Sequence, residues 1–171
     1  MELINPYNFS LLKSVDNKLV DDSGTVFPKI RGVIRIVDGS NYTDNFGFQW
    51  NKFQKTQIDR EKKDCLISKI RFFAETNWDP LSLKNQNLLE VGCGAGRFSQ
   101  VVLSNTKANL YSIDFSSAVE ANYRNNKEYK NRIQIFQASI YAMPFQNNSF
   151  DKVFCLGVLQ HTPNFKLSIE S

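Results

Sequence analysis

The sequence predicts an α/β fold built on a parallel β-sheet, and the order of four short segments supports this prediction. Residues 88–91 form a short apolar run typical of a buried parallel strand, and glycines follow at once at positions 92, 94 and 96. An amphipathic segment then begins at Phe98, and a second apolar run over 108–113 ends in Asp114. Strand, glycine turn, helix and strand in this order form the repeating unit of a parallel sheet.

The glycine turn predicts a binding site for a nucleotide-like ligand. Residues without a Cβ let the main chain bend sharply and let a ligand lie against its N–H groups, and the following helix N-terminus favours electron-rich groups. Asp114 lies 22 positions after Gly92, where a carboxylate can accept hydrogen bonds from both hydroxyls of a ribose. We therefore expect a ligand that carries a ribose, although an ordinary tight turn would also account for the glycines taken alone.

The glycine spacing distinguishes between two kinds of ribose cofactor. Dinucleotide dehydrogenases carry Gly-x-Gly-x-x-Gly, whereas here Arg97 takes the last position and the third glycine, Gly96, comes one place early. The segment 90–96, Glu-Val-Gly-Cys-Gly-Ala-Gly, resembles motif I of the class I S-adenosylmethionine (SAM) dependent methyltransferases. Three later segments resemble motifs of the methyltransferase type 11 group: Met143-Pro144-Phe145, residues 149–153 (Ser-Phe-Asp-Lys-Val) and residues 156–161 (Leu-Gly-Val-Leu-Gln-His).

This resemblance implies a Rossmann-like sheet, SAM as the cofactor, and methyl transfer to a small-molecule acceptor such as a sugar or lipid-linked intermediate. His161, the only histidine, is the candidate catalytic residue as a general base, with a packing role as the alternative. Ser139 stands where the family usually has an Asp, so adenine contacts are expected to be weaker or to come from the backbone at Ile140. The residues expected to bind or anchor the cofactor are Glu90, Gly92, Cys93, Gly94, Gly96, Asp114, Phe115, Ser139, Ile140, Leu156, Gly157, Tyr42 and Trp50.

Composition narrows the possible partners. The 171 residues are 42% hydrophobic, and the formal charge of +4 is not gathered into a basic run, so no nucleic-acid partner is expected. No apolar stretch is long enough to span a bilayer and the N-terminus does not resemble a signal peptide, so we expect no membrane partner and a cytoplasmic location. Cys65, Cys93 and Cys155 are far apart and lack C-x-x-C spacing, which predicts neither a disulfide nor a metal site.

Residues 1–40 are expected to form a small β extension. The pieces 18–20 and 30–37 are β-like, and the turn cluster Asp-Asp-Ser-Gly over 21–24 separates them. The extension resembles the zinc-ribbon-like segment found ahead of some methyltransferases. Its metal-binding cysteines are missing here, so zinc is not predicted.

Residues 41–86 are expected to form an aromatic cap followed by an amphipathic helix. Aromatic clusters are usually core packing, but Tyr42, Phe46 and Trp50 resemble the cap of methyltransferases from sugar and surface-polysaccharide gene sets, and they are second-tier site candidates. The helix is predicted over 57–76. Arg71 on this helix is predicted to bind a cofactor carboxylate or to form a surface salt bridge. The positions expected on its buried face are Ile58, Cys65, Leu66, Ile70, Phe73 and Ala74.

Residues 87–171 are expected to form the N-terminal half of the methyltransferase domain. Strands are predicted at 88–91, 108–114, 133–137 and 150–156. The resemblance implies that they lie in the order 3-2-1-4. Ser117 and Glu120 have the spacing of a capping box, which predicts a helix start, and Thr162-Pro163 predicts another. Because the later strands have no counterpart, the chain is expected to be an N-terminal fragment whose fourth strand is an exposed apolar edge.

Three alternative functions remain open at the level of sequence. A SAM-binding module without turnover is the first, because the acceptor half is missing. An NAD-binding oxidoreductase shares the glycine loop and the acid, but lacks a glycine at position 97. Nucleic-acid methylation would need clustered basic residues.

Overall fold

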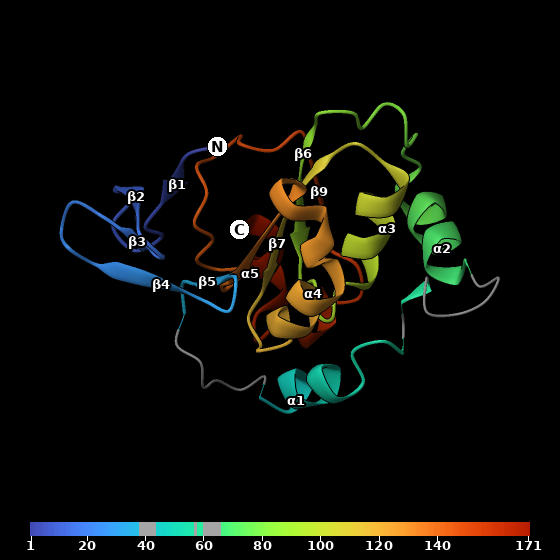
Figure 1. Ribbon diagram of the computed structural model, residues 1–171, viewed down its shortest axis with the longest axis horizontal. Helices are drawn as coiled ribbons and strands as arrows, with labels where there is room; N and C mark the ends of the chain where they lie inside the picture. Colours follow the sequence, from blue (N-terminus) through green and yellow to red (C-terminus); the bar gives the residue numbers. More distant parts are fainter. Residues whose placement is uncertain (38–43, 57, 60–65) are drawn as a thin grey trace.

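The computed structural model describes residues 1–37, 44–56, 58–59 and 66–171. They form one mixed sheet in the order β1-β2-β3-β4-β5-β8-β7-β6-β9, with helices packed against it (Figure 1). The strands are β1 (Leu3–Ile4), β2 (Leu11–Val15), β3 (Lys18–Val20), β4 (Val26–Ile30), β5 (Val33–Arg35), β6 (Asn87–Val91), β7 (Asn109–Asp114), β8 (Ile133–Gln137) and β9 (Lys152–Phe154). The helices are α1 (Asp44–Lys52), α2 (Ile67–Thr76), α3 (Arg97–Asn105), α4 (Val119–Asn126) and α5 (Phe165–Glu170), with 3₁₀ turns η2 (Lys127–Arg132) and η3 (Leu159–His161).

The four strands of the predicted parallel sheet have the expected order. β8, β7, β6 and β9 pair in parallel, which is the order 3-2-1-4 and confirms the α/β, Rossmann-like prediction. β8 has the predicted bounds, whereas β9 is shorter than the predicted 150–156. Within the described residues β9 pairs only with β6, and its Val153 is 55% exposed.

The N-terminal extension is continuous with this sheet. β1 to β5 pair with one another in antiparallel fashion, and β5 then pairs in parallel with β8, with Ile34 opposite Phe136. Leu19 and Phe27 of the extension lie in the same buried cluster as Phe136. The extension thereby covers the β8 edge, which would otherwise present unpaired backbone groups.

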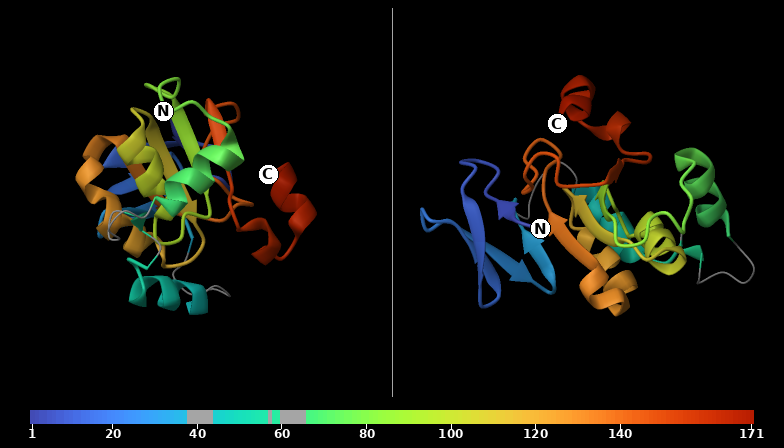
Figure 2. Two further views of the ribbon diagram at one scale, coloured as in Figure 1. Left: turned by 90° about the vertical axis from the view of Figure 1, so that its right-hand side faces the viewer. Right: turned by 90° about the horizontal axis from the view of Figure 1, so that it is seen from above.

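The two faces of the parallel sheet bury different layers, because successive side chains of a strand point to opposite sides. Leu88 and Leu110 pack with α3 and with Phe72 of α2 on one face. Leu89 and Tyr111 pack on the other face with the segment that follows β8 and with the extension. Figure 2 shows α5 on the side of the sheet opposite α4.

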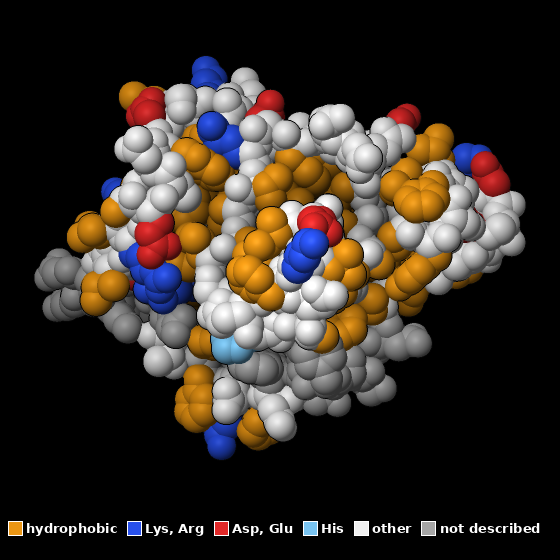
Figure 3. All heavy atoms as spheres, turned by 180° about the vertical axis from the view of Figure 1, so that it is seen from behind, with side chains coloured by type: hydrophobic (Ala, Val, Ile, Leu, Met, Phe, Trp, Pro, Cys, Tyr) orange, Lys and Arg blue, Asp and Glu red, His pale blue; other side chains and the backbone are white. Residues whose placement is uncertain are grey.

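The helix α5 leaves an apolar surface exposed. Phe165, Leu167 and Ile169 are each more than 45% exposed. Hydrophobic side chains are prominent on this side of the molecule, which is seen from behind in Figure 3. No helix in the described part of the chain has the length and apolar character needed to cross a membrane.

The predicted buried face of the helix over 57–76 is confirmed only in part: Ile58 is buried and Phe73 is half-buried against the core, whereas the other described positions of that face are exposed. The helix α2 begins at Ile67, and Leu66 and Ile70 are 53% and 68% exposed. Phe72 is fully buried instead, because its ring packs edge-on against Phe154, with ring centroids 5.0 Å apart. The aromatic layer under α2 therefore decides which face turns inward. Gln57 and residues 60–65, including Cys65, lie outside the described residues.

The predicted capping box at Ser117 and Glu120 is also wrong. The helix α4 has Ala118 as its N-cap, without a side-chain cap hydrogen bond. The carboxylate of Glu120 instead pairs with Arg31 and Arg35 of the extension. These long-range ion pairs compete for the carboxylate that a capping box would use. The second predicted helix start is close to the observed one, since Asn164 caps α5 by accepting a hydrogen bond from the Leu167 N–H.

Candidate functional site

A cavity of about 350 Å³ lies where the parallel strands end at their carboxyl termini. Ligands of open α/β sheets bind at this edge, and the volume falls within the usual range of small-molecule sites. The lining comes from the glycine turn and strand ends (residues 91–95 and 113–116), from the loops after β8 and β9 (138–141, 156–158, 161 and 162), from α2 and α3 (Arg71, Arg97 and Phe98), and from α1 and the segment after it (Trp50, Gln54 and Ile58).

The glycines of the turn serve different purposes. Gly94 lines the cavity, and a Cβ added there would meet no atom closer than Trp50 Nε1 at 3.8 Å, so this backbone is open to a ligand. At Gly96, which caps α3 with a φ of +84°, a Cβ would collide with Asn122 and Asn126 of α4. Gly92 lines the cavity and Gly96 does not. Only part of the predicted cradle therefore faces the ligand space.

Asp114 ends β7 at the wall of the cavity. One carboxylate oxygen accepts a hydrogen bond from the Gly94 N–H (2.8 Å), and the other accepts from the N–H (2.8 Å) and hydroxyl (2.7 Å) of Ser116. The acid thus joins the glycine turn to the loop after β7. A carboxylate has about four acceptor positions, so it retains capacity for a ligand hydroxyl.

Glu90 lies beneath the turn rather than in the cavity lining. It is 2% exposed, and its carboxylate accepts hydrogen bonds from the hydroxyls of Ser99 and Ser112, the latter at 2.8 Å. Burial raises the pKa of Glu90 to about 7 against the opposing effect of these two donors. Its position fits the expected anchoring of the turn.

Cys93 lines the cavity as well, and its thiol is buried. Burial and the neighbouring acids Asp114 and Glu90 raise the pKa of Cys93 well above its ordinary value. The thiol is therefore protonated at neutral pH, which disfavours a nucleophilic role.

Two guanidinium groups form a basic wall of the cavity. Arg71 and Arg97 lie over the ring of Phe98, with their Cζ atoms 5.7 and 5.0 Å from its centroid. Arg97 also donates to the hydroxyl of Ser68 (2.9 Å), and Arg71 pairs with Glu75 (2.7 Å). Desolvation and the nearby Arg71 lower the pKa of Arg97. Arg97 was not among the predicted site residues, although its place just after the glycine turn signals contact with the site.

The remaining predicted site residues come from the loops after β7 and β8 and from the cap around α1. Phe115, Ser139 and Ile140 line the cavity, and the Ser139 hydroxyl accepts a hydrogen bond from the Tyr141 N–H (3.2 Å). Trp50 of α1 lines it as well. Tyr42 and the side chain of Phe46 lie outside the described residues. Three further lining residues were not predicted: Val158 lies within the family-like segment 156–161, whereas Gln54 and Tyr141 lie in no motif.

The loop after β9 closes the opposite wall. Leu156, Gly157 and His161 line the cavity, and the histidine belongs to η3. It is the only histidine of the chain and lies at the surface, where it is coloured pale blue in Figure 3. In the described part of the chain, no cluster of three or more His, Cys, Asp or Glu residues could hold a metal ion.

Comparison with known proteins relates the part of the chain that carries the glycine turn to a protein family. Residues 89–170 match the model of a methyltransferase domain. A tRNA U34 carboxymethyltransferase from Nautilia profundicola is 29% identical over 85 residues, covering 49% of this chain and 28% of the relative. A 24-methylenesterol C-methyltransferase 2 from Arabidopsis thaliana is 25% identical over 131 residues, covering 72% of this chain and 35% of the relative. The chain thus spans about a third or less of the length of these relatives.

Solved structures share the fold. A chain from Methanococcus maripaludis assigned as a SAM-dependent methyltransferase aligns with a TM-score of 0.60 at 17% identity, covering 78% of this chain and 59% of its own. The [4+2]-cyclase SpnF aligns with a TM-score of 0.50 at 20% identity, covering 60% of this chain and 38% of its own. The fold therefore does not by itself decide the reaction. Residues 89–170 thus match a methyltransferase domain, and the described residues share the fold of SAM-dependent methyltransferases.

Proposed function

We propose that this chain binds SAM in the cavity at the strand ends and takes part in methyl transfer to a small-molecule acceptor. One observation carries the proposal: the open backbone of Gly94 and the carboxylate of Asp114 are joined by a hydrogen bond at the wall of the same cavity. A nucleoside needs both features, a turn that allows close approach and an acceptor for its ribose hydroxyls.

The donor set of the cavity suits the two ends of SAM. Asp114 would hold the ribose hydroxyls, and Phe115 and Ile140 would enclose the adenine with the Ser139 hydroxyl in reach. The guanidinium groups of Arg71 and Arg97 would hold the carboxylate of the methionine end. When bound, SAM supplies a methyl group already activated by the positive sulfur.

The chain's own residues would act mainly by positioning. Proximity and a straight approach of the acceptor atom account for much of such a reaction. Trp50 and Gly157 line the cavity as proposed cofactor contacts, and His161 lines it as well. His161 is the candidate general base for an acceptor that must lose a proton.

The acceptor is proposed to be a small molecule, such as a sugar or lipid-linked intermediate. The names of the matched relatives include a tRNA and a sterol acceptor, so the family allows both classes. The modest net charge of +4, without a basic run, favours the small molecule here. Release of S-adenosylhomocysteine with a small-molecule extract, and none with bulk tRNA, is the expected result. The opposite pattern would contradict this part of the proposal.

Calorimetric titration tests the cofactor site directly. We expect the chain to bind SAM in preference to NAD, and Asp114→Ala to weaken SAM binding about tenfold or more, because the ribose loses its acceptor and the turn loses the Gly94 hydrogen bond. Asp151→Ala is the matched control. The Asp151 carboxylate also accepts a backbone N–H, that of Asn87 (2.7 Å), but at the opposite end of the sheet.

The outcomes separate the alternatives. Equal SAM affinity for Asp114→Ala and the unmodified chain would overturn the site assignment. SAM binding without methyl transfer to any extract would favour the binding module without turnover. The division into a β extension (1–40), a cap (41–86) and a half-domain (87–171), together with a cytoplasmic location, belongs to the same proposal and is open to limited proteolysis and cell fractionation.

A further inference from the structure

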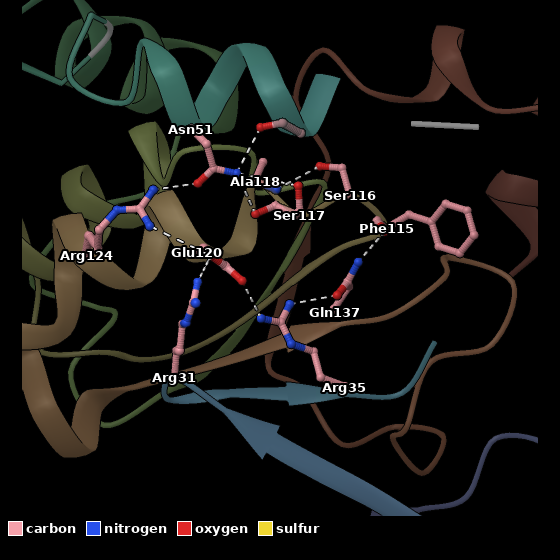
Figure 4. A network of polar contacts seen from close by, with 11 residues as sticks. Arg31, Arg35, Asn51, Phe115, Ser116, Ser117, Ala118, Glu120, Arg124 and Gln137 are labelled. Atoms are coloured by element: carbon pink, nitrogen blue, oxygen red, sulfur yellow. Dashed lines mark hydrogen bonds and ion pairs between the residues drawn. The ribbon is translucent and has the colours of Figure 1, made fainter. Parts of the chain in front are cut away.

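We propose that the N-terminal β extension sets the position of the loop at residues 115–118 and that Arg35 is the positioning residue through which it acts. The inference deepens the proposed function and rests on the SAM site described above. No described residue before Asp44 lines the cavity, so the extension has no direct contact with the ligand space. Its influence would pass through a polar network (Figure 4).

The first branch of the network runs from β5 to the loop. Arg35 donates through Nη1 to Gln137 Oε1 (2.7 Å), and Gln137 donates through Nε2 to the backbone carbonyl oxygen of Phe115 (3.1 Å). The side chain of Arg35 is 11% exposed and Gln137 is 2% exposed. A buried hydrogen-bonded pair of this kind holds one geometry, because any displacement leaves polar groups unsatisfied.

The loop that receives this hydrogen bond lines the cavity. Phe115 and Ser116 are both lining residues, and Ser116 donates to the Asp114 carboxylate through its N–H and hydroxyl. A shift of the Phe115 carbonyl would therefore move the partners of the proposed ribose acceptor.

A second branch holds the same loop from α1. Asn51 donates through Nδ2 to the carbonyl oxygen of Ser117 (2.9 Å) and accepts from Arg124 Nη2 (2.5 Å). Arg124 in turn lies 3.9 Å from the carboxylate of Glu120. Figure 4 shows the two branches meeting at Glu120, with the loop between them.

Charge pairing ties the extension to this meeting point. The Glu120 carboxylate faces three guanidinium groups: Arg35 (2.9 Å), Arg31 (3.2 Å) and Arg124 (3.9 Å). The side chain of Arg31 is 76% exposed, and the described contacts give it no hydrogen bond to Gln137. Arg31 and Arg35 therefore share an acidic partner and the same extension, and differ in the link to the loop.

This difference supplies a matched pair of variants. In calorimetric titrations of the full chain with SAM and with adenosine, Arg35→Ala is expected to raise both dissociation constants about tenfold. Arg31→Ala is expected to change them less than about twofold, since an exposed ion pair contributes little. Equal effects of the two variants, or none from Arg35→Ala, would overturn the proposal. Failure of the unmodified chain to bind SAM would instead overturn the proposed function.

Gln137→Glu tests the link without removing the Arg35 contact. The glutamate keeps an acceptor for Arg35 but removes the donor to the Phe115 carbonyl, so it is expected to weaken SAM and adenosine binding about as much as Arg35→Ala. Because the two residues act in series, the double variant is expected to bind no more weakly than the worse single variant. Additive losses would show that Arg35 acts by stabilising the fold in general. Thermal unfolding of each variant checks that it is folded at the titration temperature.

Discussion

Two carboxylates in different regions of the molecule both accept hydrogen bonds from serine hydroxyls, and yet their pKa values are shifted in opposite directions. Asp21 lies in the turn between β3 and β4 of the extension, and Glu90 lies under the glycine turn of the parallel sheet. Hydrogen bonds from neighbouring donors hold the pKa of Asp21 well below its ordinary range. Burial raises the pKa of Glu90 to about 7.

The number of donors explains the difference. Asp21 accepts from six groups: the side-chain amides of Asn5 and Asn8, the hydroxyls of Ser10 and Ser23, and the N–H groups of Ser23 and Thr25. Glu90 accepts from two hydroxyls, in a fully desolvated site. Several donors favour the charged form, and desolvation with few donors favours the neutral form. The extension thus uses an ionised acid as a structural centre, whereas the sheet tolerates an acid that prefers its proton.

Replacing Asp21, the structural centre of the extension, should have the largest effect on stability. Asp21→Asn keeps the size of the side chain but places an amide N–H₂ against a set of donors, so we expect β1–β4 to lose protection from hydrogen exchange while β6–β8 keep theirs. The same aspartate makes the stability of the extension depend on pH. Its stabilisation is present above the unfolded pKa of about 4 and is lost as the pH falls through the lower folded pKa. Unchanged protection of the extension in the variant would show that the six bonds are redundant.

Glu90→Gln should have the next largest effect, with the opposite pH dependence. The folded pKa of Glu90 is raised, so its contribution to stability is present below about pH 4.5 and is lost as the pH rises through about 7. The amide oxygen of Gln can still accept from both serines without a buried charge. We expect the variant to exceed the unmodified chain in unfolding free energy by about 3 kcal/mol at pH 8 and by little near pH 4.

Urea unfolding at the two pH values measures this change. Glu170→Gln is the control, because that carboxylate belongs to a side chain that is 58% exposed. A variant with the pH profile of the unmodified chain would refute the assignment of the titration to Glu90.

Ser112→Ala should change the unfolding free energy by less and in the opposite direction, again with the larger effect at high pH. It removes one of the two donors to Glu90, at 2.8 Å, and so raises the pKa of that carboxyl further. We expect a loss of about 1 kcal/mol at pH 5 and about 2 kcal/mol at pH 8, because a charged acceptor makes the stronger hydrogen bond. Ser104→Ala, whose hydroxyl bonds to the Gln100 carbonyl within α3, should show a loss independent of pH. Equal losses for Ser112→Ala at both pH values would contradict the comparison.

Local signals in the sequence predicted the parallel half of this fold well. The strand at 133–137, the glycine turn and Asp114 each depend on residues within a few positions, and the structure has the strand and brings the turn and the acid together. The exact face of α2 did not follow, because Phe72 turns inward to meet Phe154, which lies far away in the sequence. Periodicity shows that a helix has an apolar side, but the packing partner chooses among nearby faces.

The polar network around Glu120 could not be predicted from neighbouring residues either, because its partners are far apart in the sequence. Its spacing to Ser117 matches a capping box, and only the docking of β5 beside β8 brings Arg35 to the carboxylate. Arg35 and Gln137 are 102 positions apart. A pairing of this range has no signature in the neighbouring residues, so the loop network became visible only in three dimensions.

Asp22→Ala should have the smallest effect on stability. It separates the charge of the turn from the hydrogen bonds around Asp21. Asp22 is the immediate neighbour of Asp21, and its carboxylate pairs with Lys13 at 2.6 Å, but the two side chains are 70% and 67% exposed. We expect a change in unfolding free energy below about 0.5 kcal/mol that disappears at high salt, because solvent screens an exposed ion pair and the chain must order two side chains to form it. Urea unfolding at low and high ionic strength measures it. A loss comparable to that of Asp21→Asn would mean that the charge of the turn, rather than the number of donors around one buried carboxylate, stabilises the extension.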